Sequence, residues 1–285
     1  MGKYVITGGT KGIGGKAAEI IRRHGHEVIN IDIDNGDINA DLGTSEGREN
    51  AISQVYKLCP EGLDGLICNA GIAGLSMFKP SYVLSVNYFG TLAIAEGLYK
   101  LLKMKRGNCA VTLTGTTTYG RNGKYSVVQL LTDCGDEQRI GHLVDSFEQE
   151  SIGRQIKNND PGSGNHQGIS FHASDVGNCM YLSSKVALAL WVRRISSAWA
   201  AHGVNINAVG PGAVDTTIMH GTVDMKDGLS IFPMPALFGE ERFMDPADVA
   251  HVLAFLVLPG IKGMSGSIVY CDAGTNTVNN TERTP

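Results

Sequence analysis

The sequence predicts an α/β protein: one domain over residues 1–285, built on a doubly wound parallel sheet of about seven strands. Short apolar runs, typical of buried strands, alternate along the chain with longer stretches whose apolar residues recur at the helical period. The first run, Tyr4–Ile6, leads into a glycine-rich turn, Thr7-Gly-Gly-Thr-Lys-Gly-Ile-Gly14, and a helix follows at once. This order predicts parallel strands joined by right-handed crossovers, and no repeat or linker interrupts it.

The glycine-rich turn is the first candidate binding element. Gly8 permits a tight turn, Gly12 lets the backbone approach a pyrophosphate, and Gly14 lets helix and strand pack closely. The helix start near Lys11 and Ile13 offers unpaired N–H groups and the positive end of the helix dipole to phosphates. These features together predict nucleotide binding.

An acidic residue at the end of the second strand bears on which nucleotide is bound. After a helix over residues 15–24, the strand Val28–Ile33 places Asp32 near its carboxyl end. An acid there binds the hydroxyls of the adenosine ribose and repels a 2′-phosphate, which favours NAD over NADP. Lys11, a base within the glycine-rich turn, is a mild argument for NADP. The nearby Asp34 is interpreted as a solvated loop residue without a role in binding.

The strands and helices that follow continue the alternation. They are a short third strand that ends at Asp41-Leu42, a helix from about Glu46 to Leu58, a strand Leu63–Cys68 that leads into Asn69-Ala-Gly71, a helix that contains Asn87, and the strands Cys109–Thr114, Val204–Val209 and Ser267–Cys271. Asp245-Pro246 begins one more helix, because an aspartate N-cap followed by proline is a common helix start.

Composition and charge exclude several classes of function. Apolar residues make up 42% and charged residues 18%, and the formal net charge of −4 carries no basic block. We therefore expect neither nucleic acid nor a membrane as partner. The six scattered cysteines are interpreted as buried, reduced thiols, and the N-terminus runs directly into a strand. The expected location is the cytoplasm.

No metal site is expected. The eight histidines have no metal-ligand spacing with a cysteine or an acid on a shared helix. His166 and His172 lie shortly before the helical stretch that contains Tyr181 and Lys185, the candidate catalytic residues discussed below, and either histidine could touch substrate. Ordinary loop histidines are the more common case.

Taken together, the motifs resemble the short-chain dehydrogenase/reductase family over nearly the whole chain. The matching motifs are Thr7-Gly8-x-x-x-Gly12-x-Gly14, Asn69-Ala70-Gly71, Asn87, Tyr181-x-x-x-Lys185 and Pro211-Gly212-x-x-x-Thr216. Three segments resemble, more narrowly, the bacterial 3α-hydroxysteroid dehydrogenase/carbonyl reductase branch of this family. They are Ile31-Asp-Ile-Asp34, Ala40-Asp-Leu-Gly-Thr-Ser-Glu-Gly-Arg48 and Val86-Asn-Tyr-Phe-Gly90. The resemblance implies a single-domain Rossmann fold and NAD contacts at the glycine-rich turn and at Asp32, Asp41, Leu42, Asn69, Ala70, Gly71, Tyr181, Lys185, Pro211, Gly212 and Thr216.

Tyr181 and Lys185 are the candidate catalytic residues. Their spacing of four residues puts the phenol and the ammonium on one face of a helix, which we expect Tyr181 to open. A tyrosine pKa near 10 is too high for a base, and we expect Lys185 and the positive nicotinamide to lower it. The resemblance implies that Tyr181 exchanges the proton, Lys185 tunes it and binds ribose, and Asn87 positions a relay water. A chance Tyr–Lys surface pair is the alternative.

The chain departs from the family at the residue that holds the substrate oxygen. The usual serine position falls on Gly115, within Thr112-Leu-Thr-Gly-Thr116. Thr114 or Thr116 can supply the hydroxyl instead, and Thr116, which lies beyond the glycine, is the first choice. A β-branched run that simply favours a strand is the other interpretation.

A second departure is an insertion at about 120–178, far longer than the family pattern. Residues 126–158 have helical periodicity, and Asn158–Asn165 is predicted to be a loop. The related branch uses a shorter insertion here for subunit contact, so an interface of a homodimer or homotetramer is the first interpretation and a substrate wall the second. The apolar stretch 217–244 resembles the flap that covers substrate in this family.

The sequence thus indicates an enzyme that uses NAD to interconvert a small-molecule secondary alcohol and a ketone. The branch it resembles and the apolar flap favour a bulky hydrophobic ring substrate such as a hydroxysteroid. Two other functions stay open: an NAD-binding sensor or binding protein, and an epimerase or lyase on the same scaffold.

Overall fold

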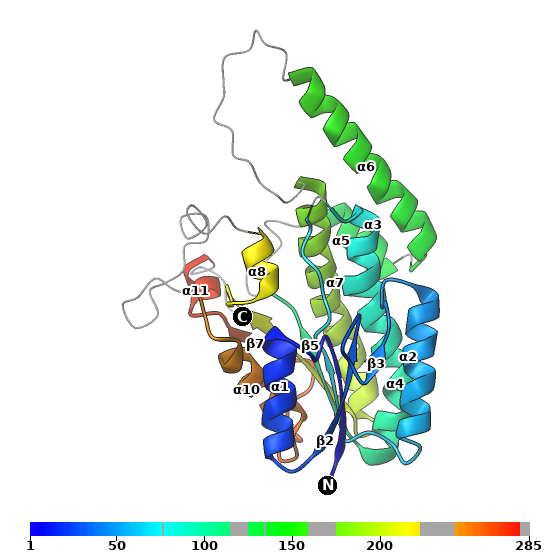
Figure 1. The fold of residues 1–285 in the computed structure, drawn as a ribbon, viewed down its shortest axis with the longest axis vertical. Helices are drawn as coiled ribbons and strands as arrows, with labels where there is room; N and C mark the ends of the chain where they lie inside the picture. The colour runs from blue at the N-terminus through cyan, green and yellow to red at the C-terminus, as the bar shows by residue number, and fades with distance from the viewer. Residues whose placement is uncertain (76, 115–124, 134, 159–174, 223–242, 280–285) are drawn as a thin grey trace.

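The computed structural model describes residues 1–285 except 76, 115–124, 134, 159–174, 223–242 and 280–285 (Figure 1). Its strands form one sheet, all parallel, in the order β3-β2-β1-β4-β5-β6-β7. The strands are β1 Lys3–Thr7, β2 Glu27–Asp32, β3 Ile38–Asn39, β4 Gly65–Cys68, β5 Asn108–Thr112, β6 Asn205–Pro211 and β7 Ile268–Cys271. The predicted doubly wound parallel sheet of about seven strands is confirmed.

Helices connect these strands and cover both faces of the sheet. They are α1 Gly12–Arg23, α2 Ser45–Leu58, α3 Pro80–Leu84, the π-helix η1 Ser85–Gly90, α4 Thr91–Lys105, α5 Tyr125–Asp133, α6 Glu137–Asn158, α7 Asp175–Ala200, α8 Thr217–Thr222, α10 Pro246–Val257 and α11 Thr275–Asn279. In Figure 1, α1 and α10 flank one side of the sheet, and α2 and α4 flank the other.

Each strand contributes to two cores because successive side chains point to opposite faces. In β1, Tyr4 and Ile6 pack with the residues of α1 and α10, whereas Val5 packs with those of α2, α4 and α7. Both faces are covered by helices, so the strands contain nearly continuous apolar runs rather than an alternation of apolar and polar residues.

The strand order reverses between β1 and β4. From β1 the chain moves outward through β2 and β3, and it then returns to the other side of β1 with β4, β5, β6 and β7. The loops after β1 and β4 therefore leave the sheet in opposite directions at its carboxyl edge. Ligands of this fold class bind in that crevice, and the glycine-rich turn and Asn69-Ala-Gly71 are the loops that flank it.

Two predicted element ends differ clearly from the structure. The third strand is Ile38–Asn39, because Asp41 belongs to a turn in which its carbonyl accepts hydrogen bonds from the backbone N and the Oγ1 of Thr44. The helix that carries Tyr181 begins at Asp175 instead of at Tyr181, since the apolar residues just before Tyr181 already pack against the core. Other ends differ by a few residues at most.

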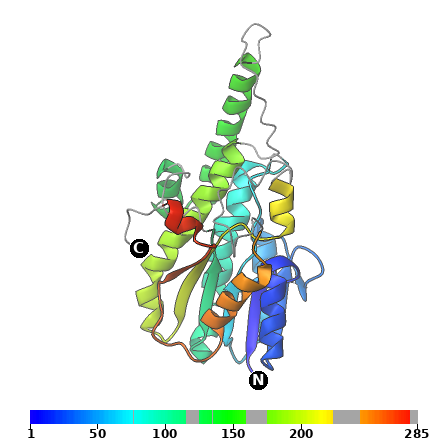
Figure 2. The ribbon, with the colours of Figure 1, turned by 90° about the vertical axis from the view of Figure 1, so that its left-hand side faces the viewer.

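The predicted helical insertion is present as α5 and α6. Helix α5 packs on α7, and the Tyr88 hydroxyl donates a hydrogen bond to the carbonyl of Leu131 at 3.0 Å. Helix α6 begins beside α3 and runs outward, so that its far end lies away from the sheet (Figures 1 and 2). Most of the predicted loop Asn158–Asn165 and most of the predicted flap 217–244 lie outside the described residues.

Over the part of the chain that the structure describes, no helix is both long enough and apolar enough to cross a membrane.

Candidate active site

The glycine-rich turn has the geometry that its spacing predicts. Gly8 has a φ of +64°, and a Cβ built on it would lie 2.9 Å from the Cα of Ala70. A Cβ on Gly14 would lie only 2.0 Å from the carbonyl oxygen of Gly8, so strand and helix approach too closely for a side chain. A Cβ on Gly12 would meet Thr216 at 3.4 Å, which places the segment after β6 beside the turn.

The residues around this turn fit a dinucleotide. Helix α1 begins directly at the turn, has no side-chain N-cap hydrogen bond and has no acidic residue in its first turn. Its first N–H groups and dipole therefore face the carboxyl edge of the sheet, the usual arrangement for a pyrophosphate. Lys11, the exposed N-cap residue, adds a positive charge at the same end.

Asn69 joins the ends of three strands. Its backbone N and that of Ala70 donate to the Oγ1 of Thr7, both at 3.0 Å. Its Nδ2 donates to the carbonyl of Gly8 at 3.1 Å, and its Oδ1 accepts from the Oγ1 of Thr112, also at 3.1 Å. The side chain thus holds β1, β4 and β5 together under the crevice. Thr7 begins the glycine motif, but the motif does not predict this contact, because nothing in the spacing indicates that the threonine hydroxyl binds the loop after β4.

Asp32 lies at the end of β2, as predicted, and binds the glycine-rich turn itself. Its Oδ2 accepts from the backbone N of Thr10 at 3.1 Å and from the Thr10 hydroxyl at 2.6 Å. Its Oδ1 accepts from the backbone N of Ile33 at 2.8 Å. A carboxylate offers about four acceptor positions, so this half-buried group retains capacity for a ribose hydroxyl.

Tyr181 and Lys185 lie on consecutive turns of α7. The Lys185 Nζ is 5.9 Å from the centre of the Tyr181 ring. It donates a hydrogen bond to the carbonyl oxygen of Thr112 at 3.1 Å, which ties α7 to the end of β5. Only 4% of Lys185 is exposed, and burial lowers the pKa of its ammonium to about 8.

The hydroxyl of Thr114 reaches the phenol of Tyr181. Burial raises the pKa of Tyr181 above its usual value, whereas a hydrogen bond from Thr114 lowers it by stabilising the phenolate. Burial is the larger effect, so the pKa of Tyr181 is raised, whereas we expected Lys185 to lower it. Thr116, the first choice for the hydroxyl, lies outside the described residues, as do His166 and His172.

Asn87 is fully buried inside η1, the π-helix between α3 and α4. Its Oδ1 accepts from the backbone N of Ile72 at 2.8 Å, and its Nδ2 donates to the Ile72 carbonyl at 2.9 Å. A Cβ on Gly71 would lie 3.2 Å from the Asn87 Oδ1 and 3.3 Å from the Lys185 Nζ. Asn87, Lys185 and the Asn69-Ala-Gly71 loop therefore meet at one point, and π-turns of this kind are frequent at functional sites.

The remaining predicted cofactor residues lie at the two ends of the crevice. On the β6 side, the Gly212 N donates to the Cys271 carbonyl at 3.0 Å, while Thr216 Oγ1 accepts from the backbone N of Met219 at 3.4 Å in the first turn of α8. On the β3 side, Asp41 Oδ1 accepts from Gly43 N at 2.8 Å, and Leu42 is buried. The structure brings Pro211 to the end of β6, beside Cys271 in β7.

Metal chemistry has no candidate among the residues that the structure places. None of their histidines, cysteines, aspartates and glutamates form a group of three or more that could hold a metal ion.

The comparisons with known proteins agree with this arrangement. The family model described as "Enoyl-(Acyl carrier protein) reductase" matches residues 165–276. The curated 3α-hydroxysteroid dehydrogenase/carbonyl reductase of Comamonas testosteroni is 29% identical over 98% of this chain and 98% of its own length. The crystal structure of the 3α-hydroxysteroid dehydrogenase from Pseudomonas sp. B-0831 complexed with NADH is 30% identical, covers 99% of this chain and 100% of that one, and superposes with a TM-score of 0.81.

The fold, the site and these relatives define an oxidoreductase class. The chain belongs to the short-chain dehydrogenase/reductase family, which confirms the resemblance of its motifs. A further relative, the coniferyl-alcohol dehydrogenase of Pseudomonas sp. strain HR199, is 26% identical over 95% of both chains.

Proposed function

We propose that this protein is an NAD-dependent dehydrogenase that interconverts a secondary alcohol and a ketone, with Tyr181 as the proton-transfer residue. The observation that carries the proposal is the hydrogen bond from Thr114 to Tyr181, with the Lys185 ammonium 5.9 Å from the same ring. A phenol that has a hydroxyl as hydrogen-bond partner and a buried cation near its ring suits proton exchange with an alcohol.

Each polar group of the site has a part in this reaction. Tyr181 accepts the proton of the substrate hydroxyl in oxidation and returns it to the carbonyl oxygen in reduction. Thr114 takes the place of the usual serine and donates to the substrate oxygen, a role for which its contact with Tyr181 makes it the better candidate than Thr116. Lys185 stabilises the phenolate, and Asn87 orders the loop at Ile72 beside it.

The proposed cofactor is NAD, held along the crevice. When bound, it supplies the acceptor or donor of the hydride. The glycine-rich turn would hold the pyrophosphate, Asp32 the adenosine ribose, and the segment Pro211–Thr216 the nicotinamide end. The relative solved as a complex with NADH supports this choice over NADP. Initial rates with NADH and NADPH test it, and a clear preference for NADPH would mean that Lys11 outweighs Asp32.

The proposed substrate is a bulky hydrophobic ring alcohol, such as a hydroxysteroid. The name of one relative, a hydroxysteroid dehydrogenase, supports a hydroxyl on a ring system. The name of another, a coniferyl-alcohol dehydrogenase, supports only a bulky substrate that contains a ring, because the hydroxyl of coniferyl alcohol is primary. An apolar pocket binds such molecules through buried area, at about 25 cal/mol per Å², and discriminates poorly among similar skeletons.

Release of NADH across steroid, bile-acid, cyclic, aromatic and linear alcohols tests the reaction, with Tyr181→Phe as the paired variant. We expect turnover of ring alcohols and a loss of at least about a hundredfold in kcat for the variant. Full activity of Tyr181→Phe would refute the mechanism. NADH binding without turnover of any alcohol would favour a sensor, and turnover that leaves no net NADH would favour an epimerase.

We further propose a homo-oligomer in a reducing compartment such as the cytoplasm. Helix α6, which runs away from the sheet, supports the first point, because a long helix that leaves the body needs another surface to bury its apolar residues (Figure 2). Leu143, 39% exposed on α6, is one such residue. Light scattering in solution tests the oligomer.

The proposal of a reducing compartment is supported by the described cysteines that form no disulfide: Cys59, Cys68, Cys109, Cys179 and Cys271.

A further inference from the structure

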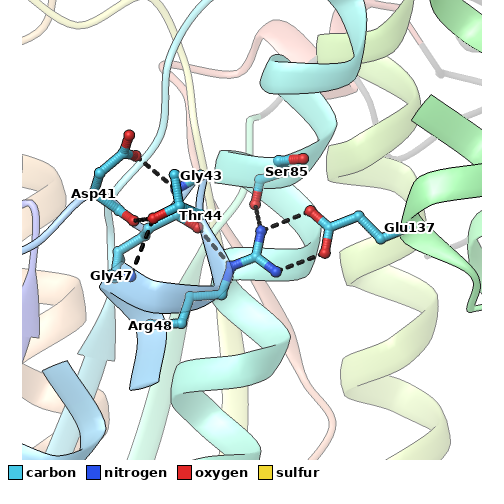
Figure 3. Close-up of polar contacts among 8 residues, drawn as sticks. Asp41, Gly43, Thr44, Gly47, Arg48, Ser85 and Glu137 are labelled. Atoms are coloured by element: carbon cyan, nitrogen blue, oxygen red, sulfur yellow. Dashed lines mark hydrogen bonds and ion pairs between the residues drawn. The ribbon is translucent and has the colours of Figure 1, made fainter. Parts of the chain in front are cut away.

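Arg48 of α2 joins three parts of the chain that are far apart in sequence (Figure 3). Its Nε donates to the carbonyl oxygen of Leu42 at 2.7 Å, in the loop after β3. Its Nη2 donates to the carbonyl oxygen of Ser85 at 2.9 Å, the first residue of η1. Its Nη1 and Nη2 also bind both carboxylate oxygens of Glu137, the first residue of α6, at 2.6 and 2.7 Å.

The Arg48–Glu137 ion pair has a well-defined geometry because the Arg48 side chain is buried. The Arg48 side chain is 8% exposed and that of Glu137 is 33% exposed. A bidentate guanidinium–carboxylate pair fixes both distance and orientation, and here the two carbonyls add two further acceptors. Removing one partner of a buried ion pair leaves the other charge uncompensated, so loss of the Glu137 charge should weaken the hold of Arg48 on Leu42 and Ser85.

Helix α6 has a second polar attachment that serves as a comparison. The Asp145 carboxylate accepts from the backbone N of Ser81 at 2.9 Å and from the Ser81 hydroxyl at 2.8 Å, at the start of α3. A Cβ on Gly141 would lie 3.3 Å from the Ser81 Cβ, so the two helices are in close contact. None of the hydrogen bonds of Asp145 reaches the loop at Leu42. The next residue of α3, Tyr82, has its own hydrogen bond to this loop, from its hydroxyl to Asp41 Oδ1 at 3.0 Å, and Asp145 takes no part in it.

We propose that Arg48 and Glu137 are positioning residues for the cofactor site. They set the loop at Leu42, on the adenosine side of the crevice, against η1, which carries Asn87 on the nicotinamide side. The first turn of the insertion is thereby part of the framework that binds NAD, in addition to any role of α6 in subunit contact. The inference rests on the proposed function for the identity of the cofactor.

The test is the equilibrium Kd for NADH, measured by fluorescence, in Glu137→Gln, Arg48→Gln and the double variant. Glu137→Gln keeps the size of the side chain and one acceptor oxygen but removes the charge. We expect its Kd for NADH to rise about tenfold, the loss of one charge-assisted hydrogen bond. We also expect the KM for the cofactor to rise in parallel while kcat falls less.

The matched control is Asp145→Asn, which weakens the second attachment of α6. We expect it to lower Tm as Glu137→Gln does, but to leave the Kd for NADH within about twofold of the wild type. Because Arg48 and Glu137 act as one unit, the double variant should bind NADH no more weakly than Arg48→Gln alone.

An unchanged Kd for NADH in Glu137→Gln, with only Tm lowered, would overturn the inference and leave a merely structural pair. Strictly additive effects in the double variant would also overturn it. The Kd does not depend on turnover. If the wild type binds NADH but oxidises no alcohol, the proposed function fails and the positioning role can still be measured.

Discussion

Burial of the Lys185 ammonium makes the stability of this protein depend on pH in a way that can be calculated. Burial lowers the pKa of Lys185 from its ordinary value of 10.5 to about 8. At about 1.4 kcal/mol for each tenfold change in proton affinity, the folded protein at pH 7 carries a penalty of about 3 kcal/mol for holding this lysine protonated. Burial of the Lys185 ammonium therefore lowers the stability of the fold at neutral pH.

The sign of the pH dependence follows from where the proton is bound more tightly. Between pH 8 and pH 10.5 the unfolded chain binds more protons at this residue than the folded protein, so stability rises with pH in that window. Below pH 8 both the folded and the unfolded protein hold the proton on Lys185, so the full penalty of burying the ammonium applies. From pH 7 to pH 9.5, Lys185 alone raises the free energy of unfolding by about 2 kcal/mol.

The assay is urea unfolding of the wild type and Lys185→Met at pH 7 and pH 9.5. Methionine is neutral and of similar length, and subtraction cancels the titration of other groups. We expect the stability of Lys185→Met relative to the wild type to fall by about 2 kcal/mol as the pH rises. Lys16→Met, which replaces an exposed lysine of α1, is the control and should show no such change. An equal difference at both pH values would refute the reasoning.

Two further predictions concern Thr114 and the glycine-rich turn. Thr114→Val removes the hydrogen bond that lowers the pKa of Tyr181. The increase of kcat/KM with pH in alcohol oxidation should therefore occur at higher pH, and kcat/KM at pH 7 should fall about tenfold. A pH–rate profile checks this. Gly14→Ala should abolish NADH binding in a folded protein, because its Cβ would lie 2.0 Å from the Gly8 carbonyl. The control is Gly25→Ala, whose Cβ would have no atom within 4 Å. Because φ at this position is +78°, alanine there should cost about 1 kcal/mol of stability while the affinity for NADH is kept.

Local chemistry explains why much of the fold was predictable. The strand–helix alternation and the glycine spacing are short-range patterns, and each specifies a backbone path within a few residues. The roles of Gly8 and Gly14 follow from that path, and the structure has both close approaches where the spacing places them. Asp32 likewise follows from its position at a strand end.

The features that the sequence did not predict depend on contacts between segments that are far apart along the chain. Arg48 and Glu137 are 89 residues apart, and no local pattern links an arginine in one helix to a glutamate in an insertion. The contact of Thr114 with Tyr181 depends on how the chain leaves β5, which a run of threonines does not specify. The pKa of Tyr181 depends on burial, and burial is set by packing across the whole sheet.

The π-helix η1 has a consequence for how the chain can vary. Helices α3, η1 and α4 form one continuous rod, since the joining residues Leu84 and Gly90 are both helical. A π-turn contains one residue more than an α-turn and takes up that residue locally. Deleting one residue of η1 would therefore restore an α-turn with little change in how α3 and α4 face the rest of the protein, whereas an extra or missing residue in α3 or α4 would rotate Ser81 relative to Leu98 by about 100°. What such a deletion in η1 would change is the direction of Asn87, whose two hydrogen bonds to Ile72 need the wider turn.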